Sequence, residues 1–299
     1  CPHALGLAIP LVSAVSTSMG AKRGLLIRQR VPFENARNID AVVFDKTGTL
    51  TEGKFGVTDL AANDGFSEEE LLTVAYSLEA NSEHPIAQGI VREGEKRELQ
   101  KKEIKDYQNL TGKGLEASID GERHRIVSPG YMKEKGIDYD EKHYQKLARE
   151  GKTVVFVLKD QILLGMIALS DMVRDTAKEA VKRLKALNIE SIMLTGDNQQ
   201  VADYVGKKLQ IDTIFAQVLP EEKSQKIAAL KEQGKKVAMT GDGVNDAPSL
   251  AKADLGIAIG AGTDVAIETA DVILVKSNPM DVVHLIQLSK ETYKKMVQN

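Results

Sequence analysis

The stretch Ala-Val-Val-Phe-Asp-Lys-Thr-Gly-Thr at residues 41–49 contains the pattern that decides the fold. Its first four residues are apolar and predict a buried strand, and the polar residues from Asp45 onward predict a loop at the end of that strand. The same pattern recurs in Ser-Ile-Met-Leu-Thr-Gly-Asp at residues 191–197 and in Val-Ala-Met-Thr-Gly-Asp at residues 237–242. The sequence therefore predicts three buried strands that each end in a polar loop.

Helical patterns lie between these strands. Residues 176–187 carry apolar side chains at spacings of three and four, and residues 221–232 follow Pro220 with acidic residues in the first turn. Strand, helix and strand in this order predict an α/β fold, with a Rossmann-like parallel sheet and helices on both faces. Further short strands are expected at residues 255–259 and 272–275.

Residues 56–165 interrupt this alternation. They contain a helical pattern at residues 68–78 and an expected hairpin of residues 153–158 with residues 162–167. We therefore predict an inserted α+β domain with an antiparallel sheet. Residues 32–55 and 166–277, on either side of the insert, would together form the domain with the parallel sheet.

The two ends of the chain are expected to lead toward a membrane. Residues 1–21 contain no Asp, Glu, Lys or Arg, and basic residues follow them directly. About 20 apolar residues can cross a bilayer, and a basic flank is typical of the cytoplasmic side. We expect residues 1–31 to form the end of a transmembrane helix with its cytoplasmic connector, and residues 278–299 to form a connector helix toward the next. Pro10 and the Ser/Thr-rich residues 13–18 leave a buried soluble segment open as the alternative.

The composition argues against several classes of function. The 40 basic and 43 acidic residues give a net charge of −3, which disfavours a nucleic-acid partner selected by positive charge. A single cysteine excludes a disulfide framework and a classical zinc module, and it indicates a reducing compartment.

The polar strand ends predict a site for phosphate chemistry. Ligands of open parallel sheets bind outside the carboxyl ends of the strands, so we expect Asp45, Thr195 and Asp242 to converge there. Two carboxylates and a hydroxyl suit Mg²⁺ together with a phosphoryl group, and a carboxylate can act as a nucleophile. Lys223 could stabilise the phosphoryl oxygens. Taken singly, each Asp could instead be a turn or helix cap.

Taken together, the three loops resemble a known family. Asp45-Lys46-Thr47-Gly48-Thr49-Leu50-Thr51 resembles the phosphorylation motif of the P-type cation-transporting ATPases. Thr195-Gly196-Asp197 and the segment Gly-Asp-Gly-Val-Asn-Asp-Ala-Pro at residues 241–248 resemble their other two signatures, in the same order. The resemblance covers essentially the whole chain. It implies the fold of the haloacid-dehalogenase superfamily, in which a nucleotide-binding insert interrupts a phosphorylation domain.

The resemblance also implies a role for each motif residue. Asp45 would attack the γ-phosphate of ATP, and Mg²⁺ would be held by the Asp45 and Asp242 carboxylates and the Thr47 carbonyl. Thr195 and Lys223 would bind the phosphoryl oxygens. The other catalytic motif residues would be Lys46, Gly196, Asp197, Asn245 and Asp246. Soluble phosphatases of the superfamily carry an acid–base Asp two residues after the nucleophile. Thr47 has no proton that titrates near neutral pH, so an acyl phosphate at Asp45 should persist.

Within the insert, Ser-Glu-His-Pro at residues 82–85 resembles an element of the heavy-metal ATPases. The resemblance implies that His84 orients the adenine end of ATP and that Glu79 contacts the base. Gly112-Lys113-Gly114 resembles the Gly-x-Gly of the family, where missing side chains let the backbone approach the nucleotide. The family's Gly-Asn pair is missing, because residues 127–132 read Val-Ser-Pro-Gly-Tyr-Met, and Gly130 is the candidate to replace it.

Cys1-Pro2-His3 resembles the metal-binding triplet of the copper or silver branch of these ATPases. A thiolate and an imidazole suit a transported Cu or Ag ion. The chain would then form the cytoplasmic domains of an integral plasma-membrane pump, with ATP, further transmembrane helices and an actuator domain as partners. Two other hypotheses stay open. One is a soluble phosphatase of the same superfamily, and the other is an ATP-binding sensor that has lost phosphoryl transfer.

Overall fold

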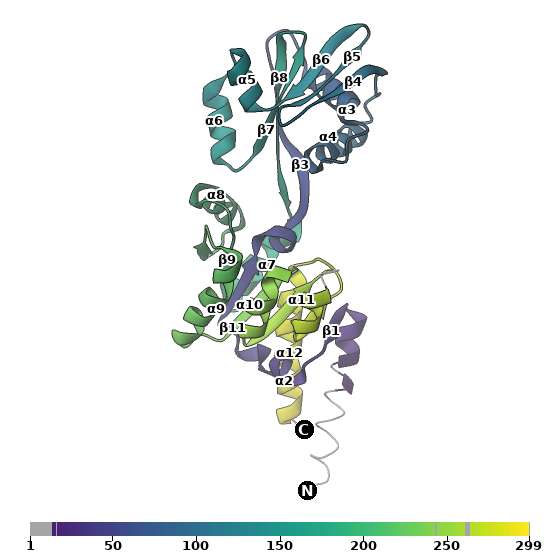
Figure 1. The fold of residues 1–299 in the computed structure, drawn as a ribbon. Coiled ribbons are helices and arrows are strands. Elements are labelled where there is room, and N and C mark those ends of the chain that lie inside the picture. The colour runs from purple at the N-terminus through teal and green to yellow at the C-terminus, as the bar shows by residue number, and fades with distance from the viewer. Residues whose placement is uncertain (1–13, 16, 243, 261–263, 299) are drawn as a thin grey trace. The chain divides into compact units, whose positions relative to one another are not determined.

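The structure, a computed structural model, describes residues 14–298 except residues 16, 243 and 261–263. The chain divides into two compact units (Figure 1). Cys1–Gly53 and Val173–Asn299 form the first unit, and Lys54–Met172 form the second. The second unit is therefore an insertion into the first.

The first unit is built on a seven-stranded sheet with the strand order β1-β13-β12-β11-β2-β9-β10. All neighbouring strands are parallel except β1, which pairs antiparallel with β13 at the edge. The strands are β1 (Leu25–Ile27), β2 (Ala41–Asp45), β9 (Glu190–Leu194), β10 (Thr213–Phe215), β11 (Val237–Gly241), β12 (Leu255–Ile259) and β13 (Val272–Leu274). The predicted parallel sheet is confirmed, whereas β1 was not predicted because three residues among basic neighbours give no strand pattern.

Helices cover both faces of this sheet (Figure 1). Successive side chains of a strand point to opposite faces, so Val42 and Phe44 pack in one hydrophobic cluster and Ala41 and Val43 in another. The first cluster is closed by α2 (Arg30–Asn35), α7 (Asp175–Ala186), α8 (Gln199–Leu209) and α12 (Met280–Gln298). The second is closed by α9 (Lys223–Glu232), α10 (Ala247–Lys252) and α11 (Asp264–Thr269). Burial on both faces explains why β2 is an uninterrupted apolar run up to Asp45.

The strand order reverses direction at β2. From β2 the chain continues to β9 and β10 on one side of the sheet, and later to β11, β12 and β13 on the other. β2 thus lies between β9 and β11, and the loops after these three strands leave the sheet at the same edge. A ligand site is expected at such a switch point.

The second unit contains a six-stranded sheet with the order β3-β8-β7-β6-β5-β4. The neighbouring pairs from β8 to β4 are antiparallel. The strands are β3 (Thr51–Ala62), β4 (Ile104–Leu110), β5 (Gly114–Ile119), β6 (Glu122–Val127), β7 (Thr153–Lys159) and β8 (Ile162–Val173). The helices α3 (Glu68–Glu79) and α4 (Pro85–Lys96) cover one face, and α5 (Pro129–Lys135) and α6 (Glu141–Arg149) cover the other. The predicted insert with an antiparallel sheet is confirmed.

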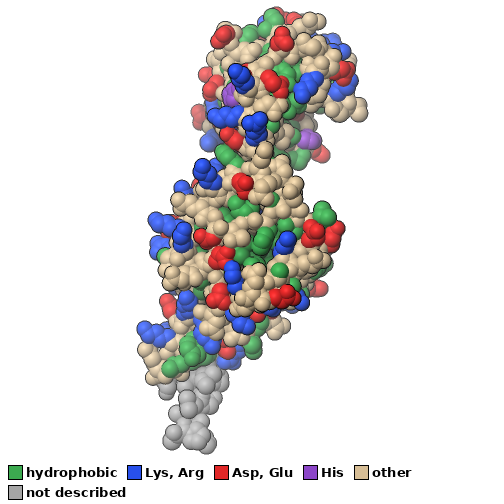
Figure 2. All heavy atoms as spheres, turned by 90° about the vertical axis from the view of Figure 1, so that its left-hand side faces the viewer, with side chains coloured by type: hydrophobic (Ala, Val, Ile, Leu, Met, Phe, Trp, Pro, Cys, Tyr) green, Lys and Arg blue, Asp and Glu red, His purple; other side chains and the backbone are tan. Residues whose placement is uncertain are grey.

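Charged side chains of both signs are interspersed over the face shown in Figure 2. None of the helices within the described part of residues 14–298 is long and apolar enough to cross a bilayer. Most of the uncharged stretch at residues 1–21, including Cys1 and His3, lies outside the described residues.

Candidate active site

The candidate site lies at the carboxyl ends of β2, β9 and β11. Asp45 is the last residue of β2, Thr195 directly follows β9, and Asp242 directly follows β11. Because β2 pairs with both other strands, the structure brings these three predicted residues together at the carboxyl ends of the strands. The expected convergence of the three strand ends is confirmed by the sheet order.

Lys223 links two carboxylates at the centre of this site. It is the first residue of α9, and its Nζ donates to Asp45 Oδ1 at 2.7 Å and to Asp246 Oδ1 at 2.8 Å. Asp246 precedes α10 and is 2% exposed. The three groups form a buried ion-pair network in which one ammonium faces two carboxylates. The network connects segments that lie up to 178 residues apart in the sequence.

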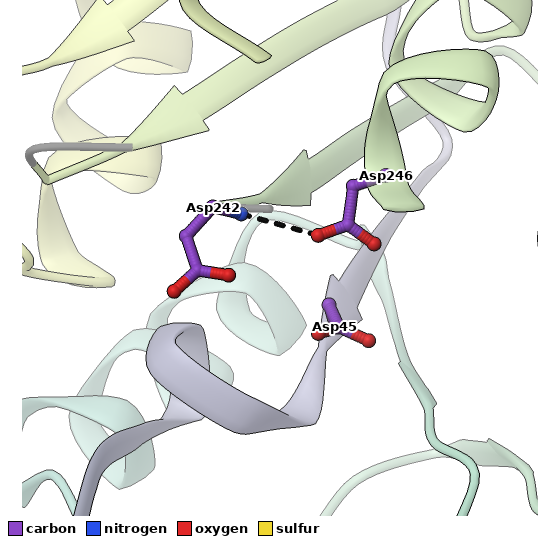
Figure 3. A group of neighbouring side chains, drawn as sticks. All are labelled: Asp45, Asp242 and Asp246. Carbon is purple, nitrogen blue, oxygen red and sulfur yellow. Dashed lines mark hydrogen bonds between the residues drawn. The ribbon is translucent and has the colours of Figure 1, made fainter. Parts of the chain in front are cut away.

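Three carboxylates point into the same small space (Figure 3). One oxygen from each of Asp45, Asp242 and Asp246 lies within 4.8 Å of the others, and the backbone N–H of Asp242 donates to Asp246 Oδ2 at 3.2 Å. Hard carboxylate oxygens this close together are the donor set that Mg²⁺ prefers. The side chains present therefore fit a divalent cation. Asp246, predicted only to support the site, is itself one of the three carboxylates.

The electrostatics of the cluster also favour a cation. Burial, and then the charge of Asp246, raise the pKa of Asp45 to about 7 in spite of Lys223. Burial and Asp246 raise the pKa of Asp242 as well. Burial alone would lower the pKa of the Lys223 ammonium, but the carboxylates of Asp45 and Asp246 beside it raise this pKa overall. Lys223 pairs with two of the three carboxylates of this cluster, and a divalent cation would relieve the excess negative charge.

A second polar network lies beside β9. Lys46 Nζ contacts Asp197 Oδ2 at 2.7 Å, and the Thr195 hydroxyl donates to the same oxygen at 2.9 Å. The Asp197 N–H in turn donates to Thr195 Oγ1 at 3.1 Å, which closes a tight turn around Gly196. Lys46, Thr195 and Asp197 therefore hold one another at the strand end.

The loop that follows Asp45 approaches Asp242 very closely. Gly48 has φ +77°, and a Cβ built on it would lie 1.8 Å from Asp242 Oδ2. Only glycine fits this backbone conformation and this distance. Thr47 and Asn245, two other predicted site residues, are both exposed to solvent.

Arg174 is a residue of this site that the sequence analysis missed. It lies in the first unit, just before α7, and its guanidinium donates to the carbonyls of Gly48 and Thr49, each at 3.1 Å. Its acceptors are backbone atoms, so no motif in the sequence signals the contact. The only available signal was a basic residue directly after a long apolar strand.

The second unit contains a cavity of about 410 Å³ on the side of α3 and α4. All four residues predicted to bind nucleotide line it: Glu79, His84, Gly112 and Gly114. Ser128 and Pro129 line it too, from the segment where the family's Gly-Asn pair is missing, whereas Gly130 lies within α5. The structure thus brings the predicted nucleotide residues together in one hollow.

Local structure fixes the histidine and one glycine of this cavity. His84 is the N-cap of α4, and its Nδ1 accepts from the Ile86 N–H at 3.3 Å. A neutral His84 therefore carries its proton on Nε2, where it is available to a ligand. A Cβ on Gly114 would lie 2.0 Å from the Ile126 carbonyl oxygen of the neighbouring strand, so that position requires glycine.

Glu79 is buried at the end of α3, and burial raises its pKa to about 7. In the unfolded chain Glu79 ionises near its ordinary pKa of 4.5, so its contribution to the unfolding free energy should fall as pH rises from 4.5 and should level off above 7.

We expect Glu79→Gln to remove this loss and to raise the unfolding free energy at pH 8 by about 3 kcal/mol relative to wild type. Urea denaturation at pH 4.5 and pH 8 measures the unfolding free energy of both proteins. The matched control is Glu83→Gln, an exposed glutamate in the same segment. Equal pH dependence in wild type and Glu79→Gln would contradict the prediction.

Comparisons with known proteins agree with this arrangement. The family described as haloacid dehalogenase-like hydrolase matches residues 39–254. The chain is 56% identical to a copper-exporting P-type ATPase B of Archaeoglobus fulgidus, over 100% of this chain and 43% of that protein. It is 46% identical to a probable copper-transporting P-type ATPase B of Staphylococcus aureus, over 100% of this chain and 45% of that protein. The chain thus spans less than half the length of these two relatives.

Solved structures show the same similarity. A zinc-transporting PIB-type ATPase in its E2.Pi state matches with a TM-score of 0.90 and 38% identity, over 100% of this chain and 49% of that chain. The catalytic domain of the CPx-ATPase CopB-B matches with a TM-score of 0.64 and 30% identity, over 90% of this chain and 98% of that chain. The resemblance that the three strand-end motifs predicted is therefore confirmed: the chain belongs to the haloacid dehalogenase-like hydrolases and, within them, to the P-type ATPases.

Proposed function

We propose that this chain binds Mg-ATP and transfers the γ-phosphate to Asp45, as the catalytic part of a pump for copper or silver ions. The observation that carries the proposal is the buried Lys223 ammonium held between Asp45 and Asp246, with Asp242 beside them. A carboxylate at a strand end, next to a fixed cation and a fitting magnesium site, is equipped for phosphoryl transfer.

In the proposed step an oxygen of Asp45 attacks the γ-phosphorus of ATP. The bond between this phosphorus and the oxygen that bridges to the β-phosphate breaks, ADP leaves with the bond's electron pair, and an aspartyl phosphate forms. Lys223 offers fixed positive charge to the phosphoryl oxygens. Mg²⁺, held by Asp45 and Asp242 with the Thr47 carbonyl, would neutralise phosphate charge and favour the ionised carboxylate. Thr195 lies at the neighbouring strand end, and its hydroxyl, which donates to Asp197 in this structure, would turn to the same oxygens.

Thr47 supports a persistent aspartyl phosphate over rapid hydrolysis. It stands where a soluble phosphatase would need a group that transfers protons, and its hydroxyl does not titrate near neutral pH. A free-standing phosphatase would release phosphate quickly from small phosphoesters, without preferring ATP. An ATP-binding sensor would bind ATP without labelling Asp45, but the complete set of Asp45, Lys223 and Asp242 gives that hypothesis no support.

The direct test is incubation of the 299-residue chain with Mg²⁺ and γ-labelled ATP, followed by an acid quench. We expect label that is stable in acid and released by hydroxylamine, as an acyl phosphate is. Label that resists hydroxylamine, or no label at all, would contradict the proposed function.

ATP is proposed to bind in the cavity of the second unit, with the His84 Nε2–H facing the ligand. Replacing His84 by Asn removes the imidazole but keeps a good N-cap for α4. The loss of one such hydrogen bond should weaken ATP binding about tenfold. Calorimetric titration with ATP measures the change, and His143→Asn in α6 is the matched control. Unchanged affinity in the His84→Asn protein would refute the contact.

The proposal also covers the transported ion, which we infer to be copper or silver. It rests on the copper pumps among the relatives and on Cys1-Pro2-His3, whose thiol and imidazole suit such ions. The chain would act on the cytoplasmic side of a plasma membrane, joined to an actuator domain and further transmembrane helices. In a membrane preparation of the whole pump, copper or silver should stimulate ATP hydrolysis, and Cys1→Ser should abolish the stimulation. Equal stimulation by zinc alone would contradict this metal class.

A further inference from the structure

One arginine holds three successive carbonyls of the loop that follows Asp45. The guanidinium of Arg174 donates from Nη2 to Gly48 O and from Nε to Thr49 O, each at 3.1 Å. Its backbone N–H donates to Leu50 O at 3.0 Å. These three contacts fix consecutive peptide groups in a stretch, Lys46–Leu50, that contains two residues with non-helical backbone angles.

The loop is also fastened at its start. The Thr51 hydroxyl donates to the carbonyl of Lys46 at 3.1 Å. The carbonyls on either side of Thr47, those of Lys46 and Gly48, are therefore both held by donors. The direction of the Thr47 carbonyl, the expected magnesium ligand, depends on the peptide groups that Arg174 fixes.

Arg174 is itself firmly anchored. It is half-buried, and its carbonyl accepts the Ala177 N–H at 3.0 Å at the start of α7. Ala177 is fully buried in the hydrophobic cluster beneath the sheet. The start of α7, the Arg174 guanidinium and the loop after Asp45 are therefore joined by one continuous set of hydrogen bonds.

We propose that Arg174 is a positioning residue for phosphoryl transfer, which shapes the loop after Asp45 so that its backbone completes the magnesium site. The proposal rests on the proposed function. Arg174 contacts the loop's carbonyls and not the reacting atoms, so it acts through the loop. A planar fork with fixed donors suits two adjacent carbonyls, whereas the single ammonium of a lysine can satisfy only part of the geometry.

The test compares Arg174→Gln with Arg174→Lys, and uses Arg183→Gln as the matched control. Arg183 lies in α7, is 60% exposed and pairs with Glu179 one turn away. We expect Arg174→Gln to slow single-turnover labelling of Asp45 about 100-fold, because a misplacement of about 1 Å near a reacting centre costs that much. It should also raise the Mg²⁺ concentration that gives half the Mg²⁺-induced shift in melting temperature, measured without nucleotide. ATP affinity should stay unchanged, since the nucleotide cavity lies in the second unit.

Two further measurements separate positioning from simple loss of structure. Arg174→Lys should fall between wild type and Arg174→Gln in rate. Guanidinium ion, well below denaturing concentration, should restore part of the rate of Arg174→Ala and none of that of Asp45→Asn. The proposal is overturned if Arg174→Gln keeps the wild-type rate and Mg²⁺ dependence. It is also overturned if all Arg174 variants lose ATP affinity and thermal stability to the same degree, with no rescue. If wild type gave no hydroxylamine-labile label, the proposed function would fail. The Mg²⁺ melting experiment would still test whether Arg174 shapes the magnesium site.

Discussion

Asp45→Asn should abolish the acid-stable, hydroxylamine-labile label that the wild-type chain takes from γ-labelled ATP. The substitution keeps the shape of the side chain at the end of β2 but removes the carboxylate that would attack phosphorus. The neighbouring Asp246 carboxylate is not free to take its place, because it is held by Lys223 and by the Asp242 N–H. The expected loss is therefore complete rather than partial.

The control for this experiment is ATP binding. Asp45 lies in the first unit and the nucleotide cavity in the second, so Asp45→Asn should bind ATP with wild-type affinity in a calorimetric titration. The matched variant is Asp40→Asn. Asp40 is exposed and directly precedes β2, so this variant should be labelled as wild type is. Persistent label in the Asp45→Asn protein would show that another residue is the phosphate acceptor.

Lys223→Met should impair both chemistry and stability. Lys223 is the ammonium shared by Asp45 and Asp246, and its side chain is 11% exposed. Removing a fixed charge of this kind from the developing transition state costs about 100- to 1000-fold in rate. Leaving two buried carboxylates without their partner should also lower the unfolding free energy by about 3–5 kcal/mol near neutral pH.

Both effects can be measured on the same preparation, by single-turnover labelling and by urea denaturation. The matched control is Lys226→Met, an exposed lysine on the same helix that lies over the Phe215 ring. Adding Mg²⁺ should recover part of the stability of Lys223→Met, because a divalent cation would offset the same carboxylate charges. Wild-type stability together with wild-type rate in Lys223→Met would rule out the role given to this residue.

The sequence predicted those parts of the molecule that have a local or periodic signature. The three strands were visible because burial on both sheet faces demands continuous apolar runs, and their polar ends were visible as abrupt changes in composition. Their convergence followed from a general property of parallel sheets, and β2 between β9 and β11 bears it out. His84 and Glu79 came from the resemblance, and both line one cavity.

The missed features depend on contacts between distant segments. β1 pairs Leu25–Ile27 with Val272–Leu274, and three residues are too few to show alternation. Arg174 recognises backbone carbonyls about 125 residues away, and such acceptors are the same in every sequence. The central place of Asp246 depends on Lys223, 23 residues earlier in the chain, whose Nζ donates to its carboxylate at 2.8 Å.

The insertion of the second unit has a consequence for protein engineering. It begins in β3 and ends in β8, which are neighbours in one sheet, and the Lys54 N–H donates to Asp171 at 3.1 Å. The two ends of the insertion therefore lie about one strand spacing apart, roughly 5 Å. Cutting the chain at both points and joining Gly53 to Val173 through a short turn would close a loop of only a few residues, which costs little conformational entropy. We therefore expect that residues 54–172 can be removed, circularised or replaced by another domain with adjacent ends.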